Sequence, residues 1–357
     1  MSRRCQALRT ALGETGYDAL VSLDPADNQY LTGFLGTASA VIVTQSEALF
    51  LCDFRYTEQA GDQVQNFVIE EVKGSLAERA GERLRTLGVK TPCFDPARLT
   101  VDALHRLATT YEAELDPAPD IVGKLRIVKT AEEIQAIRNA SQLAEGVLAD
   151  IIETLEKGLE ERELAARFEY EFKRRGATGA SFDTIALFGS RSSLPHGAPE
   201  KKTLAAGDVV LLDFGCRKRG YCSDLTRTYC FGRIPGTWFD EAYEVVLRAQ
   251  TAAVEAVRPG MSSRELDGVA RNVIAQAGYG ERFGHGLGHG VGVEIHESPK
   301  LNTETDTALE EGMVFTVEPG VYVPGKGGIR IEDLVMVTRD GCEVLSAAPR
   351  ELTILKA

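Results

Sequence analysis

The sequence has no apolar stretch approaching the length of a membrane span, and its seven cysteines include no Cys-x-x-Cys pair. Because the cysteines are odd in number and scattered, they do not suggest a disulfide framework and favour a reducing cytoplasm. Residues 1–20 contain basic side chains but no continuous apolar core after them, so they do not resemble a secretory signal peptide. These absences predict a cytoplasmic protein.

The sequence also has a shortage of positive charge. Lys and Arg number 40 against 53 Asp and Glu, and the net charge of -13 gives no overall basic field to favour nucleic acid or an anionic membrane as a partner. The remaining composition is ordinary. Its 357 residues, 43% hydrophobic and 26% charged, are enough for one large folded domain or two smaller ones.

The first third of the chain has the pattern of an α/β domain. Apolar spacing predicts helices over residues 2–13 and 76–87, and short apolar runs predict buried strands at 19–23, 40–44 and 48–52. This part contains no nucleophile elbow, phosphate-binding loop or metal-ligand spacing. We therefore expect it to frame a site rather than perform chemistry.

The pattern breaks at residues 116–123, DPAPDIVG, where two prolines resist both a continuous helix and a central strand. This break predicts a domain boundary. It divides the chain into an N-terminal domain of residues 1–122 and a C-terminal domain of residues 123–357.

Two helices are expected after the boundary. Thr130 and Glu133 form a capping-box pattern at the start of a long amphipathic helix, which Gly158 ends. A second helix is predicted over residues 161–175 and stops at Gly176. Their aliphatic stripes are typical of core-facing surfaces.

The stretch from Gly284 to Glu297, GHGLGHGVGVEIHE, contains three of the five histidines and five glycines. Glycine at every second position argues against a helix, so we expect an extended chain. In a strand, His289 and Glu297 point to one side and His296 to the other, which leaves one ligand with helpers nearby. A single histidine here would be interpreted as a surface or core residue, but the clustering favours a site.

Two aspartates flank a predicted hairpin within residues 208–232. If Lys218 and Arg219 form its tip, Asp213 and Asp224 face each other across the strands. Carboxylates in that arrangement repel and raise each other's pKa unless a cation lies between them. The alternative is a different register with one aspartate in solvent, although an Asp inside the apolar run VVLLDFG needs a buried partner.

Two glutamates occupy similar positions near the C-terminus, Glu318 in MVFTVEPGVYV and Glu332 in GGIRIEDLVMV. Either could instead pair with a buried arginine, for which Arg330 is the obvious candidate. Together with the two aspartates and His289, they make a set of four carboxylates and one imidazole. Two divalent cations neutralise that set, whereas one leaves a buried surplus of negative charge. The sequence therefore predicts a two-metal site.

The order of the motifs resembles a known family. The chain reads HG at His196, DFG at Asp213, SDLTR at Asp224, GHGVGVEIHE at His289, TVEPG at Glu318 and IRIED at Glu332. From about Lys129 to the end, this order closely resembles that of the Xaa-Pro peptidases of the pita-bread metallopeptidase superfamily. In the N-terminal third, NQYLTGFLG and FLCDFRYTEQA are similar to the smaller domain of aminopeptidase P, prolidase and creatinase.

The resemblance implies an α/β fold class, with an N-terminal creatinase/prolidase-like α/β domain and a C-terminal pita-bread domain whose curved antiparallel sheet holds the metals. The residues that match metal ligands are Asp213, Asp224, His289, Glu318 and Glu332, with Asp224 and Glu332 bridging or bidentate. Two divalent metal ions and a homodimer are also implied. Oxygen-rich ligation with a single histidine favours manganese, with cobalt or zinc as alternatives.

Further residues match substrate-handling positions of the family. His196 and His296 match histidines that orient the substrate and stabilise the tetrahedral intermediate, and Glu318 is expected to act as general base beside metal-activated water. The positions that match the substrate-binding lining are His285, Arg330, Phe182 and Ile295, the last pair next to the proline ring.

The implied function is that of a Xaa-Pro aminopeptidase, which removes the first residue from peptides with proline second. The alternative is a Xaa-Pro dipeptidase; the compact length and the N-terminal motifs favour the aminopeptidase. Methionine aminopeptidase shares the five ligands but usually lacks such an N-terminal domain. Creatinase-like relatives hydrolyse a small guanidino compound without metal and lack the ligand set. A non-catalytic binding protein on the same fold is a further alternative, and the full ligand set argues against both.

Overall fold

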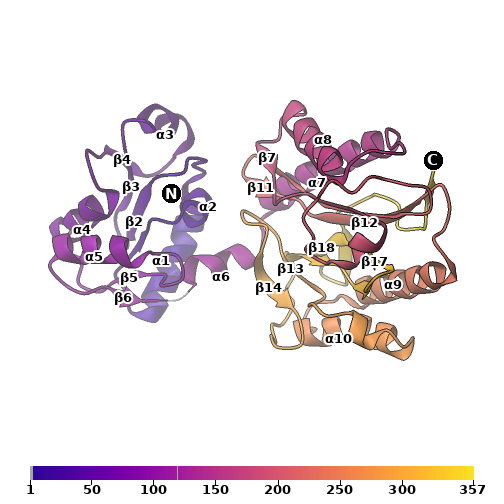
Figure 1. Cartoon of the computed structure of the whole chain (residues 1–357). Coiled ribbons are helices and arrows are strands. Elements are labelled where there is room, and N and C mark those ends of the chain that lie inside the picture. The colour runs from indigo at the N-terminus through magenta and orange to yellow at the C-terminus, as the bar shows by residue number, and fades with distance from the viewer. Residues whose placement is uncertain (1–2, 119) are drawn as a thin grey trace. The chain divides into compact units, whose positions relative to one another are not determined.

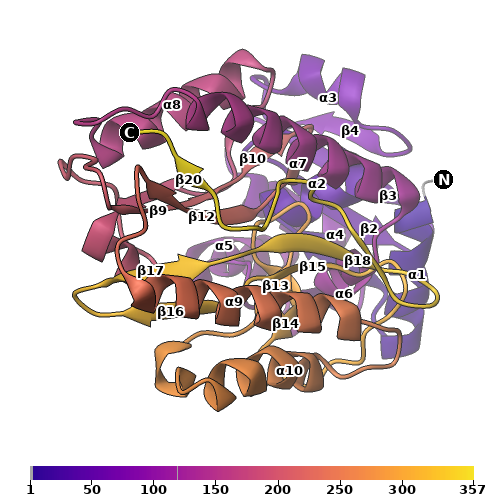
Figure 2. The same cartoon turned by 90° about the vertical axis from the view of Figure 1, so that its right-hand side faces the viewer.

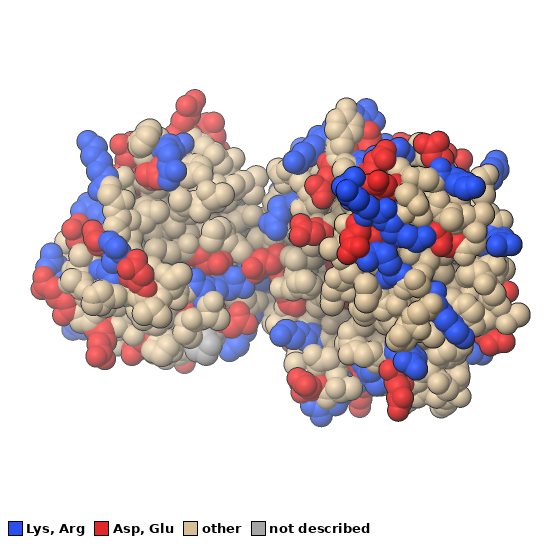
Figure 3. All heavy atoms as spheres, viewed as in Figure 1, with Lys and Arg blue, Asp and Glu red and all other residues tan. Residues whose placement is uncertain are grey.

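The computed structural model of the chain describes residues 3–118 and 120–357, which form two compact units that divide between Arg126 and Ile127 (Figure 1). Within these residues, no helix combines the length and the apolar character that crossing a membrane requires. On the face shown in Figure 3, acidic and basic side chains are mixed over both units. That face offers no continuous basic surface of the kind that nucleic acid would need.

The predicted domain boundary, between residues 122 and 123, lies inside helix α6 (Ile121–Ile127). Of the two prolines that suggested it, Pro117 belongs to the last strand of the N-terminal unit, and Pro119 lies outside the described residues.

The N-terminal unit is built on a six-stranded mixed sheet in the order β4-β3-β2-β1-β5-β6. Its strands are β1 (Ala19–Ser22), β2 (Ala40–Thr44), β3 (Ala48–Cys52), β4 (Val68–Glu71), β5 (Pro92–Phe94) and β6 (Asp116–Pro117). The pairs β1–β2 and β2–β3 are antiparallel, and the other pairs are parallel. The three predicted strands are confirmed, and they are almost entirely buried, as continuous apolar runs indicate.

The helices of this unit are α1 (Arg3–Thr15), α2 (Pro25–Thr32), α3 (Thr57–Gln63), α4 (Leu76–Thr86), α5 (Val101–Tyr111) and α6. The helices predicted over residues 2–13 and 76–87 correspond to α1 and α4, although Ser2 lies outside the described residues. Apolar faces of α4 and α5 cover the sheet and complete one core cluster with β1, β2 and β3.

The helices of the C-terminal unit are α7 (Ala131–Ile152), α8 (Glu161–Arg174), α9 (Thr237–Ala256) and α10 (Ser263–Gln276), with short 3-10 turns η1 (Gly189–Ser193) and η2 (Gly280–Arg282). The predicted capping box is present, because Thr130 accepts the N–H of Glu133 and the Glu133 side chain accepts that of Thr130. The first helix ends at Ile152, earlier than predicted. Gly158, with a φ of 92°, lies in the turn that follows it.

The strands of this unit are β7 (Gly179–Ala180), β8 (Ile185–Phe188), β9 (Val209–Phe214), β10 (Cys216–Lys218), β11 (Tyr221–Cys222), β12 (Leu225–Phe231), β13 (Gly288–Gly290), β14 (Glu297–Leu301), β15 (Val314–Val317), β16 (Gly320–Val323), β17 (Gly327–Arg330), β18 (Asp333–Val337), β19 (Cys342–Val344) and β20 (Ile354–Leu355). They form sheets in the orders β11-β10-β7, β20-β12-β9-β8, β14-β13-β15-β18-β19 and β16-β17. Every pair is antiparallel except β12–β20.

The C-terminal unit has two helix-covered cores. One lies between the α7–α8 pair and strands β8, β9 and β12, and the other joins α9 and α10 to strands that include β15, β17 and β18. In Figure 2 the strands lie between the two helix pairs. The inner faces of the sheets therefore point toward a shared interior.

The tip of the β10–β11 hairpin lies one residue later than predicted. Lys218 pairs with Tyr221, so Arg219 and Gly220 form the tip, with φ values of 50° and 82°. A two-residue turn of this kind needs positive φ at both positions, and a glycine at the second position is its usual signal. Gly220 could have located the turn from the sequence.

The later position of the hairpin tip changes the strand partner of Asp213 but not the face of the sheet on which Asp213 lies. Asp213 pairs with Thr226 rather than with Asp224. Because the shift moves each partner by two residues, and side chains alternate with a period of two, Asp224 stays on the same face as Asp213.

A fully buried arginine joins the two halves of the C-terminal unit. Arg227, in β12, is 1% exposed and donates hydrogen bonds to backbone carbonyls on both sides of β18. The accepting carbonyls belong to Thr226, Glu332, Ala348 and Pro349. Its guanidinium also donates to Asp333 Oδ1 at 2.7 Å. The Arg227–Asp333 pair therefore fixes the backbone of Thr226 and Glu332, two residues of the polar interior.

We predict that Arg227→Met lowers the free energy of unfolding of the C-terminal unit by roughly 3–5 kcal/mol. The change removes one of the two arginines that pair with buried Asp333, the other being Arg350, and it also removes the donor to four backbone carbonyls. Arg138→Met is the matched control, because Arg138 pairs with Glu343 at a partly exposed site, with 25% and 46% of the two side chains exposed. It should cost at most about 1 kcal/mol. Urea unfolding measures the free energy of unfolding of both variants. Equal losses of free energy would contradict the structural role assigned to Arg227.

Candidate metal centre

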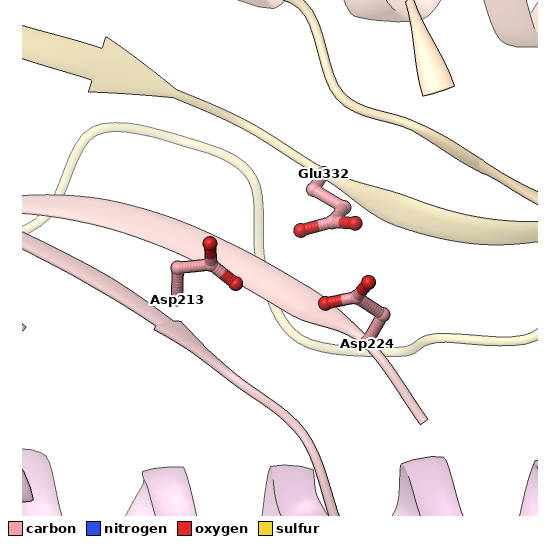
Figure 4. A group of neighbouring side chains, drawn as sticks. All are labelled: Asp213, Asp224 and Glu332. Carbon is pink, nitrogen blue, oxygen red and sulfur yellow. The ribbon is translucent and has the colours of Figure 1, made fainter. Parts of the chain in front are cut away.

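Three carboxylates from separate strands converge in the interior of the C-terminal unit. Asp213 lies near the end of β9, Asp224 immediately before β12, and Glu332 immediately before β18. Each offers one oxygen atom, and these oxygens lie within 4.8 Å of one another. Figure 4 shows the three side chains pointing toward one another. Asp224 and Glu332 are 5% and 1% exposed, so water screens their charges poorly.

In two of these carboxylates, one oxygen accepts a hydrogen bond and the other has no hydrogen-bond partner in the described part of the chain. Asp213 Oδ2 accepts from Arg330 Nη2 at 2.5 Å, and Glu332 Oε2 accepts from the Thr226 hydroxyl at 2.6 Å. Asp213 Oδ1 and Glu332 Oε1 are buried without a hydrogen-bond partner among the described residues. A buried, unpartnered carboxylate oxygen is unfavourable unless a cation lies beside it. The donor set therefore fits divalent metal ions.

His289 and Glu318 extend the cluster. His289 Nε2 lies 3.6 Å from Asp224 Oδ2 and 3.4 Å from Glu318 Oε1. The Nδ1 atom lies 3.1 Å from the Gly290 carbonyl, which can only accept, so Nδ1 carries the proton. The lone pair of Nε2 then faces two carboxylates. This arrangement suits a metal ligand, whose other ring nitrogen is held by the backbone.

Burial raises the pKa of the acids in the cluster. It is the largest cause for Asp224 and Glu332, whose pKa values lie well above the usual range, and the charges of neighbouring carboxylates raise them further. Burial likewise raises the pKa of Glu318 to about 7. It lowers the pKa of His289, so the imidazole is neutral. Without added positive charge, the site therefore favours protonated carboxyl groups.

The glycine-rich stretch is not one extended strand, as predicted, but a hairpin. β13 and β14 pair antiparallel across a turn of residues 291–296, with a register shift after His289. The turn brings the rings of His289 and His296 to a centroid distance of 4.4 Å. The close approach of Ser298 and Glu297 backbone to Gly290 leaves no room for a side chain there. Gly288, which approaches the Thr316 carbonyl, and Gly290 thus serve tight packing between strands.

The predicted flanking histidines are both exposed. His296 lies in the turn beside His289, and His196 lies in the coil after η1. A charge on His196 would lower the pKa of both His296 and Glu318, so His196 lies within electrostatic range of each of them. The structure thus brings both histidines to the carboxylate cluster.

The side chains predicted to bind substrate have different surroundings. Arg330 is 3% exposed, and it donates to Asp213, to Thr226 Oγ1 at 3.1 Å and to Tyr322 Oη at 2.6 Å. His285 Nδ1 lies 2.8 Å from the Gly286 carbonyl, and its Nε2 lies 2.9 Å from Tyr322 Oη. Burial lowers the pKa of His285 to about 4. Both side chains are thus held by protein groups.

The two proline-ring candidates have apolar side chains that make no hydrogen bonds, although the backbone of Ile295 bonds to His289. Phe182 is half-buried ahead of β8, and Ile295 packs against the apolar group that contains Cys222 and Val291. Tyr322 is a residue of the site that the sequence prediction missed. A tyrosine within the buried strand GVYV needs a partner for its hydroxyl, and that need was the available signal.

Residues 135–339 match the profile of metallopeptidase family M24, and residues 4–128 match the creatinase/prolidase N-terminal domain. The chain belongs to metallopeptidase family M24. This M24 chain is 37% identical over 355 residues to a Xaa-Pro dipeptidase of Pyrococcus furiosus, and the match covers 99% of the chain and 100% of that relative.

Solved structures extend the likeness of this M24 peptidase. A Xaa-Pro dipeptidase from Bacillus anthracis has a TM-score of 0.95 and 40% identity, with 99% of each chain covered. An X-Pro aminopeptidase from Thermotoga maritima has a TM-score of 0.90 and 36% identity, with 97% of this chain and 99% of its own covered. The predicted fold class, with a creatinase/prolidase-like domain ahead of a pita-bread domain, is confirmed.

We predict that the metal-free protein loses stability as the pH rises from about 4 to about 8. Acids whose pKa is raised on folding contribute stability below their ordinary pKa of about 4, and that contribution is lost as the pH passes their folded pKa. Asp224, Glu318 and Glu332 have raised values, and that of Glu318 is about 7.

Thermal unfolding after chelation, measured across this pH range, checks the prediction. The double variant with Asp224→Asn and Glu332→Gln removes two of the ionising groups, so its stability should fall less steeply with pH. Equal slopes for the two metal-free proteins would contradict the electrostatic account.

Proposed function

We propose that the chain is a dinuclear metallopeptidase that hydrolyses the bond before proline. The observation that carries the proposal is the pair of unpartnered oxygens, Asp213 Oδ1 and Glu332 Oε1, inside a buried cluster of acids. The donor set of Asp213, Asp224, His289, Glu318 and Glu332 would hold two divalent ions. The named relatives supply the substrate class, since the Pyrococcus, Bacillus and Thermotoga proteins are all Xaa-Pro peptidases by name.

Metal ions held there would polarise the scissile carbonyl and lower the pKa of water at the site. Glu318 would accept a proton from the attacking water and return it to the proline nitrogen, which carries no hydrogen of its own. His196 and His296, both exposed beside the cluster, would orient the peptide and donate hydrogen bonds to the developing oxyanion. Arg330 and Tyr322 hold Asp213 and His285 in place.

Manganese is the metal we propose, because four carboxylates and one imidazole form a hard, oxygen-rich set; cobalt and zinc remain alternatives. We also propose a cytoplasmic location. No disulfide bond joins the cysteines within the described residues, which suits a reducing compartment. The proposed homodimer rests on the family resemblance. Since the residues of the site lie between Phe182 and Glu332, we assign catalysis to the domain of residues 123–357.

Dipeptide hydrolysis is the form of the activity that we favour. The Pyrococcus and Bacillus relatives named as dipeptidases match the chain over at least 99% of both lengths. The compact length that favoured an aminopeptidase therefore does not separate the two activities. The Thermotoga structure supports the aminopeptidase as the second candidate.

We predict that Asp224→Asn abolishes both hydrolysis and tight metal binding while the fold persists, because asparagine keeps the shape of aspartate but removes a buried charge between the other ligands. Metal analysis after gel filtration, with circular dichroism for the fold, checks this outcome. Asp183→Asn, at an exposed aspartate of the same unit, is the control and should retain metal and activity. Full activity in Asp224→Asn would contradict the two-metal assignment.

We predict that the chelated protein, resupplied with Mn²⁺, cleaves Ala-Pro faster than Ala-Pro-Ala. Release of free alanine, measured at equal substrate concentrations, gives kcat/KM for each peptide. Faster cleavage of Ala-Pro-Ala would support the aminopeptidase instead. Cleavage of neither peptide would contradict the proposed function.

A further inference from the structure

His196 lies in an irregular segment, whereas each metal-ligand candidate lies in a strand or directly beside one. It follows η1 (Gly189–Ser193) in the coil that runs to Glu200, and its side chain is exposed. Asp213 and His289, by contrast, belong to strands. A coil that lacks ladder hydrogen bonds needs other contacts to keep a side chain in one position.

The carboxylate of Glu161 supplies such contacts. Glu161 is the first residue of α8, is fully buried at 0% exposure, and does not cap that helix with its side chain. Its oxygens accept the backbone N–H of Phe188 at 2.8 Å, the backbone N–H of Glu200 at 3.0 Å and Arg191 Nε at 2.9 Å. The buried carboxylate of Glu161 therefore binds both ends of the segment of residues 188–200, and it also binds Arg191 within that segment.

Arg191, which is bound to Glu161, also contacts the backbone close to His196. Its Nη2 atom donates to the Ala198 carbonyl at 2.7 Å, two residues after His196. On the other side of the histidine, the Pro195 carbonyl accepts from Arg330 Nη1 at 3.4 Å. The backbone is thus fixed on both flanks of His196, once through Glu161 and once from the carboxylate cluster.

Ser192 ties the same segment to the strand that carries Arg330. The Ser192 hydroxyl is buried, donates to the Gly189 carbonyl at 2.7 Å and accepts the N–H of Gly328 at 2.8 Å. Gly328 lies in β17, two residues before Arg330. The segment is therefore a fixed part of the site, and Glu161 is the charged group at its centre.

A buried carboxylate is an expensive way to satisfy two backbone N–H groups. Glu161 reduces that cost by pairing with Arg191, whose side chain is 23% exposed. The charge-assisted bonds are shorter and more directional than those of a neutral acceptor, so they define the path of the chain more sharply. None of the hydrogen bonds of Glu161 described above runs to a proposed metal ligand.

We propose that Glu161 is a positioning residue that holds residues 188–200 so that His196 faces the substrate. The proposal rests on the function proposed above, because it takes His196 to act on the bound peptide. Glu161 touches neither the reacting atoms nor the metal ligands, and it acts through His196 alone.

The test compares Glu161→Gln with Glu163→Gln, an exposed acid in the first turn of the same helix. Glutamine keeps the size of the side chain but removes its charge and one acceptor oxygen. Glu161→Gln should lower kcat/KM for Ala-Pro by about 10- to 100-fold, the effect of a small misplacement, with bound Mn²⁺ near that of the unchanged protein. Thermal stability should fall moderately, because one buried donor loses its acceptor. Glu163→Gln should behave as the unchanged protein.

A double-variant cycle shows whether the loss passes through His196. If it does, adding Glu161→Gln to His196→Ala produces no further loss of kcat/KM. Losses that multiply would overturn the proposal, as would wild-type kinetics or loss of bound Mn²⁺ in Glu161→Gln. Arg191→Gln, at a partly exposed position, removes the middle contact and should reduce kcat/KM in the same direction if Glu161→Gln fails to fold.

The ring signals of the histidines in an NMR spectrum give a readout that does not depend on the peptide. His196→Ala assigns the His196 signal, which should shift in Glu161→Gln and stay in place in Glu163→Gln. An unmoved signal would overturn the positioning role. If the unchanged protein cleaves neither Ala-Pro nor Ala-Pro-Ala, the proposed function fails, and this spectrum still decides the role of Glu161.

Discussion

The mutual repulsion of buried carboxylates is the constraint on which the C-terminal unit depends. Asp213, Asp224 and Glu332 sit within a few ångströms of one another, and Arg330 pairs directly with Asp213. Such an arrangement persists only if strands on two sheets hold the acids against their preference. The Arg227–Asp333 pair and the helix-covered cores supply that rigidity, and metal ions would supply the missing positive charge.

Much of the site could be predicted because each acid lies within a short apolar stretch of its own sequence. A carboxylate inside an apolar run such as VVLLDFG has no inexpensive structural explanation, and the order of the motifs then gives the family. The hairpin prediction misplaced the tip because it passed over Gly220. The error did not change the predicted face of Asp213 and Asp224, since a shift of two residues leaves the alternation of side chains unchanged.

Other features could not be predicted, because they depend on partners far along the chain. The helical pattern places Glu161 at the start of a helix, but nothing near it shows that the N–H groups that donate to its carboxylate lie 27 and 39 residues away. The hydroxyl of Tyr322 and the guanidinium of Arg227 are similar cases. The glycine-rich stretch was predicted as extended, and it turned into a hairpin because its backbone packs against strands that its own sequence does not reveal.

The spread of the acids over residues 213–332 has a consequence for how the protein folds and stays folded. The donors meet only after β9, β12 and β18 have assembled, and such non-local pairing is slow to form. A metal ion therefore cannot direct the early steps of folding. It binds to, and stabilises, the structure that has already folded. At 100 times its dissociation constant, a bound ion adds about 2.7 kcal/mol to the folded state. A loaded molecule should accordingly open less often to proteases than an empty one.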